Sequence, residues 1–531
     1  MYGRIVSRAL ALALLVGGFV PVSAFAAFGI VSSGGNYSVD TEGGLVFRVN
    51  GSSCDINSLR LNGGAELQAT SAGSHLSSGL GSATVTTSLS PSGTTGVISC
   101  STSTLTHYMA VRRGQNIIYM ATYISAEPSV GELRWITRLN SGVLPGGPTP
   151  STIRDTAGAI ESSDIFGLSN GQTRSKYYGN DQARNLGIRG VTGSGIGVFM
   201  VYGSRESASG GPFFRDIQTQ LGGNTELYNY MNSGHNQTEP NRINVLHGPY
   251  ALVFTTGSTP AVPDMSWMSG LNLRGWVSGR GTVQGQVSGV TGGIAAFVGF
   301  ANSTAQYWTA PNSSGNFTSP AMKPGSYTMT LYQGELAVAT RTVSVSSGGT
   351  TTGQNLASTW STPSALFRIG TWDGAPTGFK NFSNLTIMHP SDVRMSTWGT
   401  TNFVVGSSAT SDFPAYQWKA VNNSTTVHFN LSSGQVAAHT VRIGITAAYA
   451  GGRPQITVNS WTSPAPAPSS QPSSRSLTLG TYRGNNTLYT YNVPASAFVS
   501  GANVMTVTAI SGSSGSGFLS PAYSYDCVEL F

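Results

Sequence analysis

Lys176 is the single lysine among residues 1–322, where every other basic side chain is arginine or histidine. It stands in the motif Thr173-Arg-Ser-Lys-Tyr-Tyr, two residues after Arg174. Arginine does not give up its proton, whereas a neighbouring cation and partial burial lower the pKa of a lysine towards neutrality. Lys176 is therefore a candidate general base that acts as a neutral amine. The alternative interpretation is a surface lysine without a catalytic role.

A second candidate lies at the end of the segment Tyr228-Asn-Tyr-Met-Asn-Ser-Gly-His, which closes on His235. The alternation of a strand places Tyr228 and Tyr230 on one face, and the polar Asn-Ser-Gly turn then presents His235 at the rim of the sheet. Tyrosine rings commonly line carbohydrate grooves, and an imidazole gives or takes a proton near neutral pH. A hydrogen-bonded structural histidine is the alternative.

The third candidate is an arginine in Gly131-Glu-Leu-Arg-Trp-Ile-Thr-Arg-Leu. Strand alternation puts Glu132, Arg134 and Arg138 on one face and Leu133, Trp135 and Leu139 on the other. An arginine on a half-buried strand can bind the carboxylate of a substrate through two parallel hydrogen bonds. It can equally form a structural ion pair with Glu132 or another acid.

Lysine, histidine and arginine together fit the β-elimination of a uronate, a sugar acid, better than hydrolysis. Elimination removes a proton next to a carboxylate, so it needs a cation for the carboxylate, a base, and an acid that protonates the departing oxygen. Polysaccharide hydrolases use two carboxylates instead. No such pair is recognisable in the spacing of the few acids of the N-terminal region. A hydrolase remains an alternative, because two carboxylates that are distant in the sequence can lie close together in the fold.

The elements that position these residues are predicted to be strands. Only 9% of the residues are charged, against roughly 25% in a typical globular protein. This excludes a helix-rich cytosolic enzyme, while 39% hydrophobic residues suffice for a large core. Alternating segments such as 116–124 and 196–202 are bounded by Gly, Ser, Asn or Pro, and no stretch keeps helical periodicity for three turns. The predicted fold class is all-β.

The arrangement of strand-like segments and turns changes along the chain, and these changes divide it into three predicted domains. Residues 27–268 form a large β-sandwich. Residues 271–357 form a small immunoglobulin-like sandwich, since their strands recur about every ten residues. Residues 358–531 form a third β-domain. The proline-rich segment that begins at Ser463 is interpreted as a long loop inside this third domain, because strands resume after it; a linker between modules is the alternative.

Residues 1–26 have the pattern of a secretory signal peptide. Arg4 and Arg8 precede an apolar stretch, and the small residues Ala24 and Ala26 stand at the cleavage site. A transmembrane anchor is the alternative, but the apolar run is shorter than a membrane span requires. Asn-X-Ser/Thr sequons recur along the chain and favour a eukaryotic secretory route. We therefore expect a secreted, extracellular glycoprotein.

Three cysteines remain to be placed in this oxidising compartment. Cys54 and Cys100 lie in strand-like segments near the N-terminus and are the predicted disulfide. Cys527 is predicted to be a buried, inert thiol, because Ser-Tyr-Asp-Cys-Val-Glu-Leu-Phe is typical of a final core strand.

The net charge is +7, and it falls to +5 when the predicted signal peptide with Arg4 and Arg8 is removed; a mildly basic secreted protein suits an anionic polymer as partner. Nucleic acid is not expected, because the arginines are scattered, no basic run is longer than Arg112-Arg113, and no helix-turn-helix or zinc spacing is present. A membrane is not expected as a partner either.

Longer motifs are distributed over the whole mature chain. They are Ala27-Phe-Gly-Ile, Ser74-His-Leu-Ser-Ser-Gly-Leu-Gly, Thr173-Arg-Ser-Lys, Tyr230-Met-Asn-Ser-Gly-His, Leu246-His-Gly-Pro-Tyr, Ile369-Gly-Thr-Trp-Asp-Gly-Ala-Pro-Thr-Gly-Phe and Tyr525-Asp-Cys-Val-Glu-Leu-Phe. Together these motifs resemble the fungal rhamnogalacturonan lyases of polysaccharide lyase family 4. Shared motifs of this length are specific.

The resemblance implies a catalytic β-sandwich of the galactose-mutarotase-like kind, a fibronectin-III-like middle domain and a carbohydrate-binding-like jelly roll. It also implies an endolyase that cleaves the rhamnose to galacturonic acid linkage of rhamnogalacturonan I, a plant cell-wall polysaccharide, and leaves an unsaturated galacturonate. By the same resemblance, Lys176 is the base and His235 the acid, while Arg134, Tyr228 and Tyr230 contact the substrate. The alternatives are a pectin-directed glycoside hydrolase and a non-catalytic carbohydrate-binding protein.

No step of this chemistry needs a cofactor. Jelly-roll carbohydrate modules often hold a structural calcium ion, and Asp373, Asp392, Asp526 and Glu529 are available for one. The sequence contains no contiguous calcium loop, so we expect no catalytic metal and leave a structural calcium open. We expect the protein to be a monomer.

Overall fold

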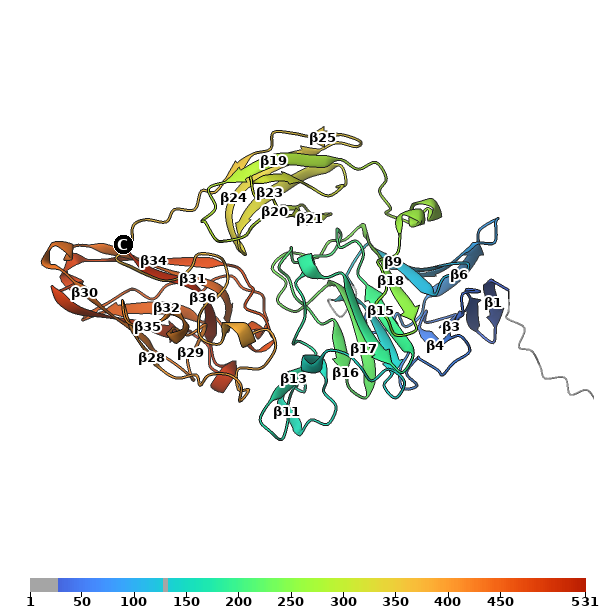
Figure 1. Ribbon diagram of the computed structural model, residues 1–531, viewed down its shortest axis with the longest axis horizontal. Helices are drawn as coiled ribbons and strands as arrows, with labels where there is room; N and C mark the ends of the chain where they lie inside the picture. Colours follow the sequence, from blue (N-terminus) through green and yellow to red (C-terminus); the bar gives the residue numbers. More distant parts are fainter. Residues whose placement is uncertain (1–26, 128–131) are drawn as a thin grey trace, which may run out of the picture.

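The computed structural model describes residues 27–127 and 132–531. The predicted signal peptide lies outside the described residues. The described part of the chain consists mainly of strands, with a few short 3-10 helices between some of them. The strands form three β-domains (Figure 1). Domain I contains β1 to β18, domain II contains β19 to β26 and domain III contains β27 to β36. The predicted all-β fold class is confirmed.

The elements of domain I are β1 (Gly29–Ser33), β2 (Asn36–Asp40), β3 (Leu45–Asn50), β4 (Ile56–Leu61), β5 (His75–Leu76), β6 (Thr84–Leu89), β7 (Thr95–Ser101), β8 (Leu105–Arg112), β9 (Ile117–Ile124), β10 (Leu133–Asn140), η1 (Thr149–Ser151), β11 (Gly158–Glu161), β12 (Ile165–Gly167), β13 (Thr173–Ser175), η2 (Ala183–Asn185), β14 (Ile188–Gly193), β15 (Ile196–Val201), β16 (Thr219–Leu221), β17 (Asn224–Asn232), β18 (Val245–Thr255) and η3 (Ser266–Leu271).

Domain I is a sandwich built on a seven-stranded sheet in the order β14-β15-β18-β9-β8-β7-β6. A four-stranded sheet, β16-β17-β10-β5, packs against it. Trp135 of β10 is fully buried, and its ring stacks on His107 of β8 with centroids 5.0 Å apart. Leu133 and Leu139 lie in the same core. The predicted alternation of β10 is therefore confirmed, and the opposite face of this strand carries Arg134 and Arg138 on either side of the buried Ile136.

A small three-stranded sheet, β11-β12-β13, extends from domain I on the side of domain III (Figure 1). We call residues 158–175 the β11–β13 lobe. Its strands are only three or four residues long. A lobe of this size cannot bury enough apolar surface to be rigid by itself, so its position depends on what it contacts.

The elements of domain II are β19 (Thr282–Ser288), β20 (Ala296–Ala301), β21 (Gln306–Thr309), β22 (Asn316–Thr318), β23 (Gly325–Gln333), β24 (Leu336–Val345), β25 (Thr350–Thr351) and β26 (Leu356–Ala357). They form two packed sheets, and alternate residues of β23 point into the core between them. This agrees with the predicted immunoglobulin-like sandwich.

The elements of domain III are β27 (Phe367–Gly370), η4 (Phe382–Asn384), β28 (Thr401–Val404), η5 (Thr410–Asp412), β29 (Tyr416–Trp418), β30 (Thr425–Leu431), η6 (Ser433–Gln435), β31 (His439–Tyr449), β32 (Arg453–Val458), β33 (Trp461–Thr462), η7 (Ser476–Thr478), β34 (Thr487–Val493), η8 (Ala495–Ala497), β35 (Gly501–Ile510), η9 (Gly517–Leu519) and β36 (Ala522–Leu530).

Domain III consists of two five-stranded sheets. The proline-rich segment after β33 is a long loop within the domain, because β34 and β35 return to the two sheets after it. The last strand, β36, is buried along its whole length and pairs with β27, β29 and β31. Cys527 lies in it, and burial raises the pKa of its thiol, so the predicted buried free cysteine is confirmed.

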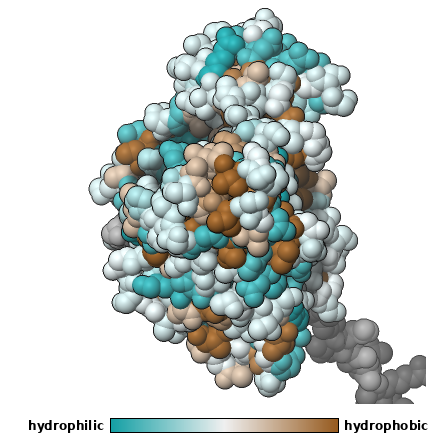
Figure 2. Space-filling view, turned by 90° about the vertical axis from the view of Figure 1, so that its left-hand side faces the viewer, coloured by the Kyte–Doolittle hydropathy of each residue, from teal (hydrophilic) through white to brown (hydrophobic). Residues whose placement is uncertain are grey.

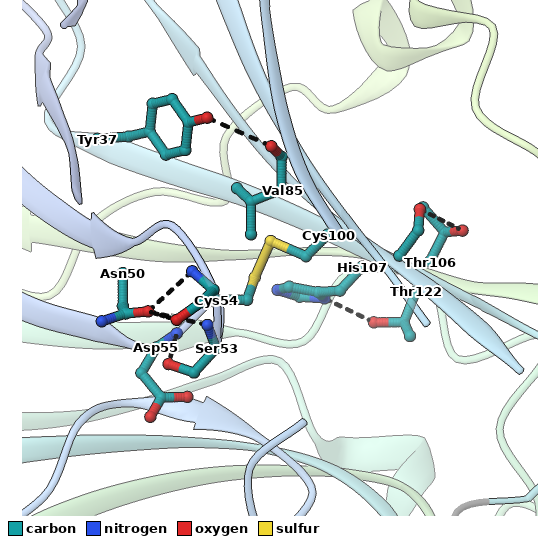
Figure 3. Close-up of a disulfide and its surroundings, with 12 residues drawn as sticks. Tyr37, Asn50, Ser53, Cys54, Asp55, Val85, Cys100, Thr106, His107 and Thr122 are labelled. Carbon is teal, nitrogen blue, oxygen red and sulfur yellow. Dashed lines mark hydrogen bonds between the residues drawn. A yellow bond between two sulfur atoms is a disulfide. The ribbon is translucent and has the colours of Figure 1, made fainter. Parts of the chain in front are cut away.

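The predicted disulfide between Cys54 and Cys100 is present (Figure 3). Cys54 lies between β3 and β4, and Cys100 lies on β7, so the bond joins the first sheet of domain I to the seven-stranded sheet. Next to it, His107 Nδ1 lies 2.9 Å from the hydroxyl of Thr122. Both cysteines are buried, which keeps the bond away from solvent reductants.

The surface reflects the low charge of the sequence. The face in Figure 2 is mainly of intermediate hydropathy, with small separate groups of hydrophobic and hydrophilic residues. Among the residues that the structure describes, no helix has both the length and the apolar character needed to cross a lipid bilayer.

Candidate active site

Lys176 directly follows β13, at the end of the β11–β13 lobe. Its Nζ lies 3.2 Å from Oδ1 of Asp164, in the turn between β11 and β12. The side chain is 25% exposed, so the amine is within reach of a substrate without lying in bulk solvent. The carboxylate of Asp164 therefore contacts the amine of Lys176 on one side.

Arg174 is not the neighbour of this amine that the sequence suggested. The guanidinium of Arg174 donates to the carbonyl of Thr173 at 2.9 Å and lies close to Asp392 and Arg394 of domain III. Strand β13 ends at Ser175, and the chain turns there, so the side chains at 174 and 176 have different partners.

Tyr177 connects Lys176 to His235. The ammonium nitrogen of Lys176 lies 5.6 Å from the centroid of the Tyr177 ring. The hydroxyl of Tyr177 lies 3.2 Å from Nε2 of His235, and the two rings meet edge to face. Burial and the charge of Asp164 raise the pKa of Tyr177, so its hydroxyl stays neutral. A lysine and a histidine from two different sheets therefore meet at one tyrosine.

His235 lies in the loop after β17, beside two carboxylates. Its Nδ1 is 3.2 Å from Oδ1 of Asp216, and its Nε2 is 3.5 Å from Oε1 of Glu132. Burial opposes protonation of the ring, and the charge of Lys176 opposes it further. The charges of Asp216 and Glu132 outweigh both effects, so the pKa of His235 is raised above its ordinary value. A histidine of this kind is suited to donate a proton at neutral pH.

Arg134 lies on β10, directly opposite Tyr230 of β17. Its guanidinium donates to the hydroxyl of Tyr230 at 2.7 Å and forms an ion pair with Glu132. Burial works against the charge of Arg134, but Tyr230 and Glu132 raise the pKa of the guanidinium, so the group remains a cation. The side chain is 19% exposed, which leaves it able to meet an anionic substrate.

The rings of Tyr228 and Tyr230 lie on one face of β17, as strand alternation predicted, with centroids 6.0 Å apart. Their exposed fractions are only 6% and 4%. Their hydroxyls hold charged side chains: Tyr230 contacts Arg134, and Tyr228 donates to Glu226. In this structure the two tyrosines therefore position charges and do not offer open rings for a sugar to stack on.

The row of charges continues along the same sheet. Glu226 accepts a hydrogen bond from Nε of Arg138 at 3.1 Å, and NH1 of Arg138 lies 2.7 Å from Nε2 of His75. Burial and the charges of Arg138 and Arg134 lower the pKa of His75 to about 4. His75 is therefore neutral near pH 7 and can accept the hydrogen bond from Arg138.

A cleft of about 760 Å³ lies between domains I and III, and Asp164, Tyr177 and His235 line it from domain I. Residues of β31 and of the loop that contains Arg475 line its other side. A larger cavity, of about 840 Å³, lies between domains I and II, but none of the candidate residues above lines it. Of the candidate residues His235 lines this cleft, and Lys176 contacts two residues that line it, Asp164 and Tyr177. We therefore assign the active site to the cleft between domains I and III.

The acids available for calcium in domain III have different surroundings. Asp392 forms an ion pair with Arg394, and Glu529 forms ion pairs with Arg368 and Arg442. Bound arginines already neutralise both carboxylates, so these two do not fit a calcium ligand set.

Asp373 and Asp526 are adjacent in the interior of domain III. Burial raises the pKa of Asp373 to about 6, and burial and the neighbouring Asp373 raise the pKa of Asp526 further. Backbone N–H groups of Asp373 and Gly374 donate to Oδ1 of Asp526. Within residues 27–127 and 132–531, no group of three or more His, Cys, Asp or Glu side chains has the geometry to hold a metal ion.

Sequence reasoning missed the partners of the candidate residues. Asp164 lies in the turn before β12, Asp216 is 19 residues from His235, and Arg475 is 311 residues from Asp164, so no local pattern connects these partners. One signal was available: the chain has only 21 acids, so each isolated acid in the first domain could have been examined as the partner of a cation.

Comparison with known families gives consistent matches along the chain. Residues 28–275 match the N-terminal domain of rhamnogalacturonan lyase B, residues 279–353 match domain II of polysaccharide lyase family 4, and residues 365–530 match domain III of that family.

Curated relatives are similar over nearly their whole length. The chain is 50% identical to "Probable rhamnogalacturonate lyase A" of Aspergillus fumigatus, over 96% of this chain and 96% of that protein. It is 49% identical to "Rhamnogalacturonate lyase A" of Aspergillus aculeatus, over 97% of this chain and 98% of that protein. It is also 49% identical to "Rhamnogalacturonate lyase A" of Emericella nidulans, over 95% and 96% respectively.

Proposed function

The chain belongs to polysaccharide lyase family 4, and on this basis we propose that it is a secreted rhamnogalacturonan endolyase. Its substrate is the alternating rhamnose and galacturonic acid backbone of rhamnogalacturonan I. The reaction is a β-elimination that leaves an unsaturated galacturonate at the new non-reducing end. The observation that carries this proposal is the meeting of Lys176 and His235 at Tyr177, on a cleft between two domains.

Lys176 is the base. Its neutral amine removes the proton from C5 of the galacturonate, the carbon next to the carboxylate, and the electron pair left on C5 forms the new double bond to C4. The bond from C4 to the glycosidic oxygen breaks in the same process. Asp164 fixes the amine from one side, so that its free pair can face the sugar.

His235 is the acid. The departing glycosidic oxygen needs a proton, and the raised pKa of His235 keeps the imidazolium available near pH 7. Asp216 holds Nδ1, so Nε2, now beside Tyr177, is the nitrogen that donates. The leaving oxygen replaces the tyrosine hydroxyl as the partner of Nε2.

Arg134 binds the carboxylate of the reacting galacturonate. Negative charge spreads onto this carboxylate as the C5 proton leaves, and a fixed guanidinium stabilises that charge more in the transition state than in the ground state. Tyr230 orients the guanidinium directly, while Tyr228 supports the same face through Glu226.

The proposal is tested by near-ultraviolet absorbance of the purified protein on rhamnogalacturonan beside homogalacturonan. Absorbance must rise on rhamnogalacturonan, because the product carries a new conjugated double bond. Lys176→Ala must remove the signal while thermal unfolding stays unchanged. Lys419→Ala, which removes an exposed lysine of domain III, is the matched control and must keep the signal. A folded Lys176→Ala protein with the wild-type rate contradicts the assignment.

The same assay separates the alternatives. New reducing ends without absorbance indicate a hydrolase, and binding without turnover indicates a carbohydrate-binding protein. The hydrolase is disfavoured by the surroundings of the nearby carboxylates: Glu132 is paired with Arg134, and Asp216 with His235. We further propose that the protein acts outside the cell as a monomer and needs no metal for the chemistry.

A further inference from the structure

The β11–β13 lobe and residues 176–179, which directly follow it and begin with Lys176, are attached to domain III through several polar contacts. Asp392 accepts hydrogen bonds from the backbone N–H and the hydroxyl of Thr173, at 2.6 and 2.8 Å. The hydroxyl of Tyr178 donates to the carbonyl of Thr478 at 2.9 Å, and Gly179 N–H donates to the carbonyl of Thr386 at 2.9 Å. The proposed base therefore lies in a part of domain I whose position is fixed by contacts with domain III.

Arg475 is the residue of domain III that comes nearest to the chemistry. It lies in the proline-rich loop just before η7, and its side chain is 17% exposed. NH2 of Arg475 lies 2.7 Å from Oδ2 of Asp164, and NH1 forms an ion pair with Glu161. Arg475 also lines the cleft between domains I and III.

Asp164 is consequently shared by two cations. Its Oδ1 faces Lys176 at 3.2 Å, and its Oδ2 faces Arg475 at 2.7 Å. The guanidinium cannot lose its proton, so its positive charge offsets the negative charge of Asp164 at all working pH values. Without Arg475, the whole charge of Asp164 would act on the amine of Lys176 and would favour its protonated form.

We propose that Arg475 is a positioning residue for the elimination, which acts from domain III through Asp164 and keeps Lys176 available as a neutral base. This inference rests on the proposed function. It gives domain III a part in the reaction besides binding carbohydrate. It also assigns to Arg475 the tuning role that the sequence had suggested for Arg174.

Three further titratable groups of domain I lie near Lys176 or its neighbours. Tyr177 lies below the amine and stays neutral. His235 opposes the charge of Lys176, and Asp216 in turn compensates His235. These groups belong to domain I and remain in place when Arg475 is replaced, so a change caused by Arg475 is separable from them.

The test is the pH dependence of kcat on rhamnogalacturonan for Arg475→Met. We expect the acidic limb of the profile, where Lys176 becomes protonated, to move to higher pH by about one unit, which corresponds to about a tenfold loss of rate on that limb. Arg475→Lys keeps a cation beside Asp164, so it should restore most of the wild-type profile. This rescue distinguishes tuning by charge from a general loosening of the domains.

A double-mutant comparison shows whether the effect passes through Asp164. In an Asp164→Asn background, Arg475→Met should move the acidic limb by less than about 0.3 unit, since the carboxylate that connects the two cations is absent. Arg394→Met, which removes another arginine from the same interface, is the matched control and should leave the limb where it is.

An unmoved acidic limb in Arg475→Met, or the same shift in the Asp164→Asn background, overturns this inference. If the wild-type protein forms no unsaturated product at all, the proposed function fails as well. If wild type forms that product and only the limb stays unmoved, the proposed function stands and the inference about Arg475 alone fails.

Discussion

Nδ1 of His235 lies 3.2 Å from the carboxylate of Asp216, and this contact determines which state of the imidazole is present near neutral pH. Burial alone would make the ring neutral, whereas the carboxylate of Asp216 makes the largest contribution to the raised pKa. The same contact leaves Nε2 as the nitrogen that faces Tyr177 and the cleft. One hydrogen bond therefore sets both the charge and the orientation of the proposed acid.

Replacement of Asp216 should change the alkaline side of the pH profile. The acid works only while His235 is protonated, so activity falls as the pH rises through its pKa. Asp216→Asn removes the anion that raises this pKa, so the alkaline limb of kcat should move to lower pH by about one unit. The measurement is the pH dependence of near-ultraviolet product formation. Asp181→Asn, which alters the ion pair with Arg189, should leave the limb in place and serves as control. A shift to higher pH would contradict the assigned role.

Removal of the Arg134 guanidinium should reduce kcat/KM strongly. Arg134→Ala takes away the cation that stabilises the growing charge on the carboxylate, and a loss of about 10²–10³-fold is expected. Tyr230→Phe removes one hydrogen bond to the guanidinium, so about a tenfold loss is expected. Steady-state kinetics of both variants check the order of the two effects. A Tyr230→Phe loss as large as that of Arg134→Ala would contradict a contribution of Tyr230 limited to one hydrogen bond to the guanidinium.

The disulfide should stabilise domain I. It closes a loop with a sequence separation of 46 residues, and chain-entropy arguments give about 4 kcal/mol for a loop of this length. The double variant Cys54→Ser/Cys100→Ser should therefore unfold at a lower temperature than wild type. Because unfolding exposes the buried bond, reductant present during the thermal scan should lower the unfolding temperature of wild type but not that of the double variant, which provides the internal control. An unchanged unfolding temperature in the double variant would show that the disulfide does not stabilise the domain.

Chelation should leave the reaction rate intact. In the proposed mechanism Lys176, His235 and Arg134 supply the base, the acid and the cation, and no proposed step uses a metal ion. Prolonged dialysis against EDTA, followed by the absorbance assay and a thermal unfolding scan, checks this expectation. A fall in rate without a change in unfolding temperature, reversed by added Ca²⁺, would contradict it.

Strand alternation predicted the faces of β10 and β17 correctly. The side-chain direction in a strand repeats every two residues and is set by the local backbone. The sequence therefore indicated that Arg134 lies opposite to Trp135 on its strand, and that Tyr228 and Tyr230 share a face. The pairing of Cys54 with Cys100 was predicted from the expected oxidising compartment and from the place of both residues near the N-terminus, although Cys54 lies between two strands and not within one. The burial of Cys527 was predicted from the apolar character of the last segment.

The sequence by itself thus determined the β-rich fold, the faces of the strands and the side-chain types that could carry out an elimination, because these depend on composition and on neighbours along the chain. Only the tertiary structure decided which charges surround them. Asp164 is 311 residues away from Arg475 in sequence, and Asp216 is 19 residues away from His235. The strength of an ion pair depends on distance in space and on burial. Both are set by the packing of separate sheets and domains, and local sequence periodicity contains no information about them.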